Sequence, residues 1–130
     1  MSTIENFHHI IFRTKGSRKT IPEETKRTML AYMCHVSEAM GVTVLRINAH
    51  LNHLHIFVNL PAEVSVSSYV QKIKSTSSKV FQTHPEFPHF EGWARKYASF
   101  SKSKDDKDMV VNYIRNQEEH HRHKTFEEEL

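Results

Sequence analysis

The sequence predicts an α+β fold of the ferredoxin-like βαββαβ type, an antiparallel sheet with helices on one face plus a C-terminal helix. Two observations predict it. Short stretches rich in β-branched and aromatic residues alternate with stretches whose apolar residues recur at helical spacing. Only three glycines and four prolines interrupt the chain, and no repeat or linker divides it. We therefore expect a single domain, 1–130, around one core.

The first half of the chain supplies three strands and one helix. The stretch 7–14, FHHIIFRT, is a predicted strand that a basic loop follows. A helix is predicted from Pro22, which suits a first helical position, to Gly41, which can end it. The stretches 42–49 and 53–60 are predicted strands, and the short connection between them favours an antiparallel pair.

The second half supplies the remaining elements. Apolar residues at helical spacing predict a helix over 66–81, and WARKYASFS (93–101) is a plausible fourth strand. Ser103 or Asp105 can cap a last helix, which we expect from about 106 to about 121. This order completes the βαββαβ pattern and adds one helix. Because such a fold serves many functions, function has to be argued from particular residues.

Composition narrows the function only slightly. Lys and Arg number 18 against 15 Asp and Glu, and the modest excess leaves nucleic-acid binding and a plain solvated surface both open. Cys34 is the only cysteine, which favours a reducing, cytoplasmic location and excludes an intramolecular disulfide. No apolar run approaches the roughly 18 residues of a membrane span. We expect a soluble protein with no membrane partner.

The stretch HLHIFVNL (53–60) contains two histidines separated by one leucine. Side chains alternate between the two faces of a strand, so Leu54 and Ile56 point into the core while His53 and His55 share the opposite face. This geometry allows two imidazoles to bind one divalent ion. Among eleven histidines, a chance His-x-His is not rare, and these residues alone leave metal binding and coincidence equally open. His50 is assigned the other parity and left out of the pair.

The last predicted helix carries a second pattern. Tyr113 and Gln117 are four positions apart and therefore share one helical face. One reading is that Tyr113 belongs to a buried stripe with Val110 and Ile114, and that Gln117 is solvated. The other combines them with the histidines. A tyrosine hydroxyl is a weak nucleophile that needs a cation or base, and an amide carbonyl can complete coordination begun by two neutral imidazoles. Such a site could act on a phosphodiester.

These patterns together resemble the single-tyrosine HUH transposases of bacterial and archaeal insertion sequences. This is the insertion-sequence 200/605 group, which includes the REP-associated tyrosine transposases. The resemblance rests on the two histidines that flank a hydrophobic residue, on Tyr-x-x-x-Gln, and on HLHIFVNLP, SVSSYVQKIKSTSS, GWARKYASFSKS and VNYIRNQEEHHRHKTFEEEL in that order. It extends from about His8 to the C terminus.

The resemblance implies roles for individual residues. His53 and His55 would be metal ligands, Gln117 the third ligand and Tyr113 the nucleophile, with Mg²⁺ or Mn²⁺ as the cofactor. It implies a metal-dependent transposase that cleaves and rejoins single-stranded DNA through a 5′-phosphotyrosine intermediate. Asn52 stands where many relatives have an acidic residue. An amide carries no charge, which changes the electrostatic environment of the metal.

The resemblance also implies partners. We expect single-stranded DNA with hairpin ends, a prokaryotic cytoplasm, and a homodimer in which C-terminal helices can be exchanged. The segment SFSKSKDD (99–106), interpreted as a short mobile connection, is compatible with that exchange. Two alternatives remain. One is a replication or relaxase-type nickase with the same chemistry. The other is a non-catalytic or domesticated module that binds single-stranded nucleic acid.

Basic side chains are candidates for phosphate contacts, although a merely solvated role is as open for each lysine. They follow the first strand, lie on the second helix, and surround the fourth strand: Arg13, Lys15, Arg18, Lys19, Lys72, Lys74, Lys79, Arg95, Lys96, Lys102 and Lys104. Trp93, Tyr97 and Phe100 could stack on bases. For Trp93 and Phe100 we expect core packing instead.

Overall fold

The structure is a computed structural model, and it describes residues 5–116 of the chain. Within that range it contains four strands, three α-helices and two short 3₁₀ helices. In chain order they are β1 (Phe7–Thr14), η1 (Lys15–Ser17), α1 (Lys26–Ala39), β2 (Thr43–His50), β3 (His53–Asn59), α2 (Val66–Phe81), β4 (Trp93–Lys102), η2 (Lys104–Asp106) and α3 (Lys107–Arg115).

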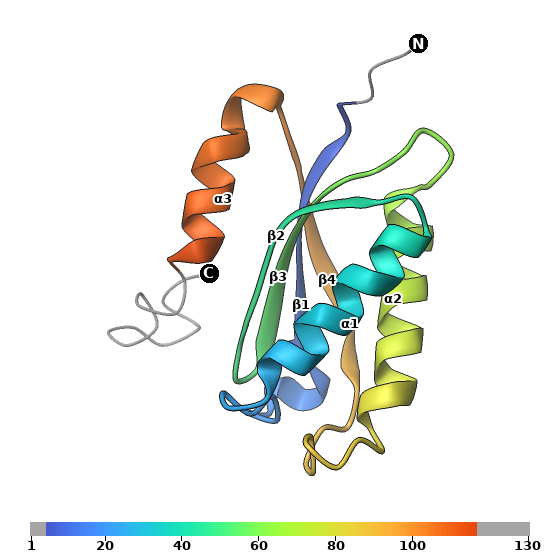
Figure 1. The fold of residues 1–130 in the computed structure, drawn as a ribbon, viewed down its shortest axis with the longest axis vertical. Coiled ribbons are helices and arrows are strands. Elements are labelled where there is room, and N and C mark those ends of the chain that lie inside the picture. The colour runs from blue at the N-terminus through green and yellow to red at the C-terminus, as the bar shows by residue number, and fades with distance from the viewer. Residues whose placement is uncertain (1–4, 117–130) are drawn as a thin grey trace.

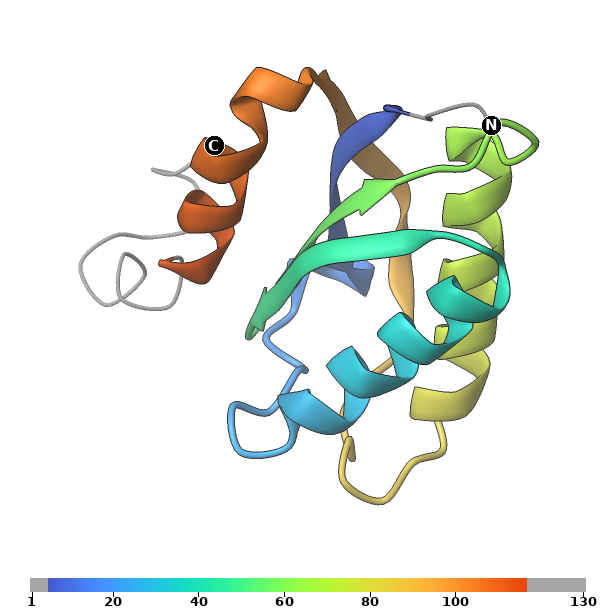
Figure 2. The same cartoon turned by 45° about the horizontal axis from the view of Figure 1, so that its top comes forward.

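The four strands form one antiparallel sheet in the order β2-β3-β1-β4. Helices α1 and α2 cover one face of the sheet, and α3 lies on the other (Figures 1 and 2). This is the predicted α+β, ferredoxin-like arrangement with an additional C-terminal helix. No helix within residues 5–116 is long and apolar enough to cross a membrane.

Strand alternation divides the buried residues between the two faces, as predicted. Even-numbered residues of β1 and β3, such as Ile10, Leu54 and Ile56, pack under α1 and α2 in the main core. On the opposite face, Phe7 and Phe57 form a smaller cluster with residues of α3. The sheet is therefore covered by helices on both faces, and the second face is the one that carries His53 and His55.

The bounds of α2 agree with the sequence prediction, whereas α1 begins later than predicted. The Ser65 hydroxyl accepts a hydrogen bond from the backbone N–H of Ser68 at 3.1 Å, which caps the start of α2. Helix α1 begins at Lys26 rather than at Pro22, because residues 23–25 form turns. Strand β2 extends to His50, so the turn to β3 consists of Leu51 and Asn52.

The connection between β4 and α3 differs from the prediction. Residues 99–102 belong to β4 and 104–106 form η2, so the segment 99–106 is regular rather than an open connection. The Asp106 carboxylate accepts hydrogen bonds from the backbone N–H and hydroxyl of Ser103, at 3.1 and 2.9 Å. This capping box closes the start of η2, which leads directly into α3. The part of that helix predicted beyond 116, with Gln117, lies outside the described residues.

Candidate active site

Tyr113 lies on α3 above the second face of the sheet. Its ring centroid is 5.9 Å from that of His55 and 5.9 Å from that of His9. Val110 and Ile114 on the same helix are buried against the sheet, whereas Tyr113 is 42% exposed. Tyr113 is therefore not part of the buried stripe. The structure brings the tyrosine and the histidine pair of one chain together.

His53 and His55 are buried side by side. Their ring centroids are 5.1 Å apart, and both side chains are nearly inaccessible to solvent. The shared face predicted from strand alternation is thus confirmed.

A turn residue orients the first imidazole. Nδ1 of His53 is 2.9 Å from Oδ1 of Asn52, and an amide oxygen can only accept, so Nδ1 carries the proton. The lone pair of His53 is then on Nε2, which is the atom that a metal would use. Nδ2 of Asn52 donates to the carbonyl oxygen of Ser17 at 3.3 Å, which holds the amide in this orientation. Asn52 therefore performs the orienting role without a charge.

A third histidine, which sequence analysis missed, contacts the second imidazole. Nε2 of His9 on β1 lies 2.9 Å from Nδ1 of His55, and the two ring centroids are 5.2 Å apart. Burial, with a smaller contribution from the positive charge of Lys102, lowers the pKa of His9 to about 4, so His9 is neutral at pH 7. Only the register between β1 and β3 reveals this contact, and the sequence does not give that register.

His50 also lies closer to the site than predicted. It is the cross-strand partner of His53, and the two ring centroids are 6.0 Å apart. Directly paired residues of an antiparallel pair point to the same face. The parity argument was wrong for His50 because alternation does not continue through the turn between β2 and β3.

The donor atoms suit a divalent metal. His53 and His55 each have Nδ1 engaged in a hydrogen bond, which is how metal-binding imidazoles are commonly oriented. Residues 5–116 hold no cluster of three or more His, Cys, Asp or Glu side chains suited to a metal. Gln117, the predicted third ligand, is not one of these four residue types, and it lies outside residues 5–116. Its role stays a prediction.

Comparisons with known proteins identify the family of the chain. Residues 4–117 match the sequence family described as "Transposase IS200 like". The chain belongs to the IS200-like transposases. It is also 24% identical over 115 residues to the transposases of insertion sequence element IS200 from Salmonella typhimurium and Salmonella typhi. That match covers 85% of this transposase and 75% of each relative.

Two solved structures share the fold of this IS200-like transposase. A putative transposase from Deinococcus radiodurans R1 superposes with a TM-score of 0.68 at 18% identity, covering 89% of this chain and 93% of that one. A REP-associated tyrosine transposase bound to a REP hairpin superposes with a TM-score of 0.70 at 14% identity, covering 93% and 72%.

In this transposase, α3 packs mainly on β2 and β3, which leaves β1 and β4 more open on the same face. A cavity of about 380 Å³ lies beside Tyr113 and is also lined by His9 and Lys102.

A neighbouring groove of about 510 Å³ is lined by Arg13, Arg95 and Lys96, among others. Ile11 and Phe100 line both, so the two hollows adjoin. Arg13 pairs across the strands with His53, next to the site.

The aromatic residues of β4 differ in their exposure to solvent. Trp93 is buried in the main core, as expected. Phe100 is 49% exposed, which contradicts the expectation of core packing. It pairs with His9 across the strands and therefore faces the open part of the sheet rather than α1 and α2. Tyr97 is also exposed and remains a candidate for base stacking.

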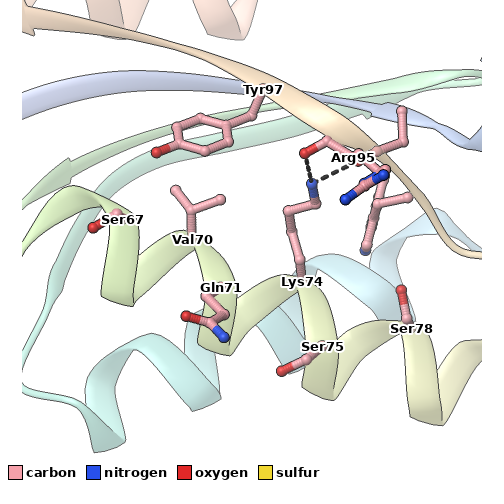
Figure 3. A pocket seen from close by; sticks show the side chains of 10 residues that line it. Ser67, Val70, Gln71, Lys74, Ser75, Ser78, Arg95 and Tyr97 are labelled. Carbon is pink, nitrogen blue, oxygen red and sulfur yellow. Dashed lines mark hydrogen bonds between the residues drawn. The ribbon is translucent and has the colours of Figure 1, made fainter.

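The basic residues of α2 lie on the far side of the sheet from Tyr113 (Figure 1). Lys72 and Lys79 are exposed there. Lys74 donates from Nζ to the carbonyl oxygens of Ala94 and Arg95, at 2.5 and 3.0 Å, and so fastens α2 to β4 (Figure 3). Partial burial lowers the pKa of Lys74. Phosphate contacts by these three lysines stay predictions, and the site does not include them.

The remaining candidates lie around the short 3₁₀ helices. Arg18 forms an ion pair with Glu91, and Lys104 pairs with Glu5 at 3.6 Å. Lys15 and Lys19 are exposed close to Arg13 in sequence. Because surface ion pairs hold their partners weakly, these cations remain able to bind phosphates.

Proposed function

We propose that this IS200-like transposase cleaves and rejoins single-stranded DNA through a covalent 5′-phosphotyrosine intermediate on Tyr113. One observation carries the proposal: a half-exposed tyrosine lies beside His55, one of two buried, neighbouring imidazoles of the same chain. A tyrosine that served only packing would be buried with Val110 and Ile114. Its exposure lets a phosphodiester approach the hydroxyl.

We also propose that His53, His55 and Gln117 hold Mg²⁺ or Mn²⁺. When bound, a divalent ion would offset the negative charge of the phosphodiester under attack. The contribution of the chain is to keep both imidazoles neutral and oriented before the ion arrives. The hydrogen bonds at Nδ1 of His53 and His55 support this role.

The reaction needs no external energy source. The Tyr113 oxygen loses its proton and attacks the phosphorus, and the bond from phosphorus to the 3′-oxygen breaks. The released 3′-oxygen takes up a proton and becomes a free hydroxyl. In the reverse direction a 3′-hydroxyl attacks the phosphotyrosine, which joins two strands and restores the tyrosine. The covalent link conserves the bond energy between the two steps.

The DNA would follow the open half of the sheet. Arg13 and Lys102 flank the path and can bind phosphates, while Phe100 can stack on a base. The structural relative whose title names a bound REP hairpin supports a hairpin-bearing substrate. We further propose a homodimer in which α3 can lie over the sheet of either subunit.

The test uses a hairpin-bearing single-stranded oligonucleotide with Mg²⁺ or Mn²⁺. Wild-type protein should form a covalent DNA adduct on denaturing gels. Tyr113→Phe should form none, because it lacks the hydroxyl that attacks the phosphorus, yet it should still bind the oligonucleotide in a gel-shift assay. Asn112→Ala, an exposed change on α3 at a residue that does not line the cavity beside Tyr113, is the matched control and should retain the adduct.

Several outcomes would count against the proposal. An adduct that persists in Tyr113→Phe would remove Tyr113 from the reaction. Undiminished cleavage by wild-type protein in excess chelator, or by His53→Ala, would contradict the metal site. Binding without any cleavage by the wild-type chain would favour the alternative of a non-catalytic nucleic-acid-binding module.

A further inference from the structure

His9 is a buried histidine that the proposed reaction does not use. It lies on β1, and its ring contacts those of His55, Tyr113 and Phe100 on three sides. It is also part of the wall of the cavity beside Tyr113. A polar ring in this position needs a partner, because burying an imidazole without a hydrogen bond is costly.

The partner of His9 is Nδ1 of His55, at 2.9 Å. One nitrogen must donate and the other accept. If Nδ1 of His55 donates, its lone pair is on Nε2, which matches the tautomer that Asn52 imposes on His53. If His9 donates instead, Nε2 of His55 carries the proton and cannot bind a metal. The direction of this one hydrogen bond therefore determines whether the two imidazoles can act as a pair.

We propose that His9 is a positioning residue of the metal site, accepting a hydrogen bond from Nδ1–H of His55 so that Nε2 of His55 faces the ion. This rests on the proposed function, since it presumes that His53 and His55 bind a metal. His9 serves His55 as Asn52 serves His53. The two rings are inclined by only 29°, which suits a hydrogen bond that lies close to the plane of both imidazoles.

The two orienting residues come from different parts of the fold. Asn52 directly precedes His53 in sequence, whereas β1 brings His9 to His55 through the β1–β3 pairing. Residues in register there are His9 with Phe57 and Ile11 with His55, so His9 reaches His55 diagonally. A change of register between β1 and β3 would separate His9 from His55 and leave Asn52 beside His53.

Metal binding by full-length variants tests the proposal. His9→Phe keeps an aromatic ring but removes the acceptor, and it should weaken Mn²⁺ binding, measured by calorimetry or electron paramagnetic resonance, about 10- to 100-fold. His9→Gln places an amide oxygen near the position of Nε2 and should recover most of the affinity. His8→Phe is the matched control, because the neighbouring residue points to the opposite face and bonds Asn6. It should bind Mn²⁺ like wild type.

Equal Mn²⁺ affinity in His9→Phe and wild type would overturn the role of His9. So would His9→Gln binding as weakly as His9→Phe, because the acceptor would then not be the cause. A wild-type chain that binds no Mn²⁺ would overturn the proposed metal site, and the role of His9 with it. Comparing the thermal unfolding of each metal-free variant with that of metal-free wild type distinguishes a loss of Mn²⁺ affinity from a loss of folding.

A spectroscopic measurement on the wild-type chain covers the case in which His9→Phe fails to fold. Long-range ¹H–¹⁵N correlations distinguish the two neutral tautomers of each histidine. We expect the Nδ1–H tautomer for His55 in metal-free protein. The Nε2–H tautomer would show that His9 donates, and it would overturn the proposal without any variant.

Discussion

In each histidine of the pair, the hydrogen-bond partner of Nδ1 determines how the ring is oriented. For His53 that nitrogen donates to a neutral amide, where many relatives are expected to have a carboxylate. A hydrogen bond to a carboxylate is stronger and raises the basicity of the ligand. Asn52 gives the same orientation with less electron donation. In the proposed metal site, the amide would therefore orient His53 without adding a negative charge.

In the main core, a single hydroxyl accepts a buried hydrogen bond and should contribute to the free energy of unfolding. Nε1 of Trp93 donates to the Ser77 hydroxyl at 2.9 Å in the main core. Ser77→Ala leaves this indole N–H without that acceptor and should lower the free energy of unfolding by about 1–3 kcal/mol, measured in urea. Ser75→Ala, on the exposed side of α2, is the control and should change it by less than about 0.5 kcal/mol. Equal stabilities of the two variants would refute the role of this bond.

At the scale of elements, periodicity predicted which face a residue occupies but not which strand lies beside it. The bounds of α2 and the shared face of His53 and His55 followed from local patterns. His9 beside His55 depends on strand register, which is set by the packing of the whole sheet. Phe100 was misplaced for a related reason: its exposure depends on how much of the sheet α3 covers.

The stability of the 3₁₀ turn η2, which leads into α3, should respond to pH. Hydrogen bonds from the Ser103 backbone N–H and hydroxyl hold the pKa of Asp106 below its usual range. The stabilisation is therefore present above the ordinary Asp range and is lost as pH falls through the lowered pKa. The gap in thermal midpoint between wild type and Asp106→Asn should be largest near neutrality and narrow below about pH 4.

Asp105→Asn supplies the matched comparison for this prediction. It removes the same charge from the same 3₁₀ turn, but Asp105 does not form the capping box with Ser103. Its difference from wild type should be smaller across the same pH range. If the two variants showed the same pH dependence, the effect would come from net charge and not from the cap.

At the scale of the whole molecule, the two faces of the sheet have separate tasks. Helices α1 and α2 enclose the main core, while α3 brings Tyr113 to the histidines. Because the described residues place Tyr113 beside His55 of its own chain, each subunit of the proposed dimer can hold both halves of its site. Exchange of α3 would place the same tyrosine over the partner's sheet.

Mixing two inactive variants tests that exchange. Tyr113→Phe retains the histidine pair, and His53→Ala retains the tyrosine. If α3 is exchanged in a homodimer, mixed dimers regain one intact site and should recover partial DNA cleavage. Light scattering establishes the oligomeric state. Dimers that stay inactive after mixing would show that α3 remains on its own subunit, and a monomer would contradict the dimer itself.

The small size of the cluster under α3 has a consequence for the stability of different regions. The buried contacts of α3 rest on Val110 and Ile114 against Phe7 and Phe57, while the rest of the buried apolar residues lie mainly on the other face. The last helix can therefore detach in a sub-global opening that leaves the main core folded. The backbone amides of α3 would exchange with solvent deuterium sooner than those of β1 and β3. The proposed nucleophile, Tyr113, thus lies on the helix that packs on the smaller of the two buried clusters.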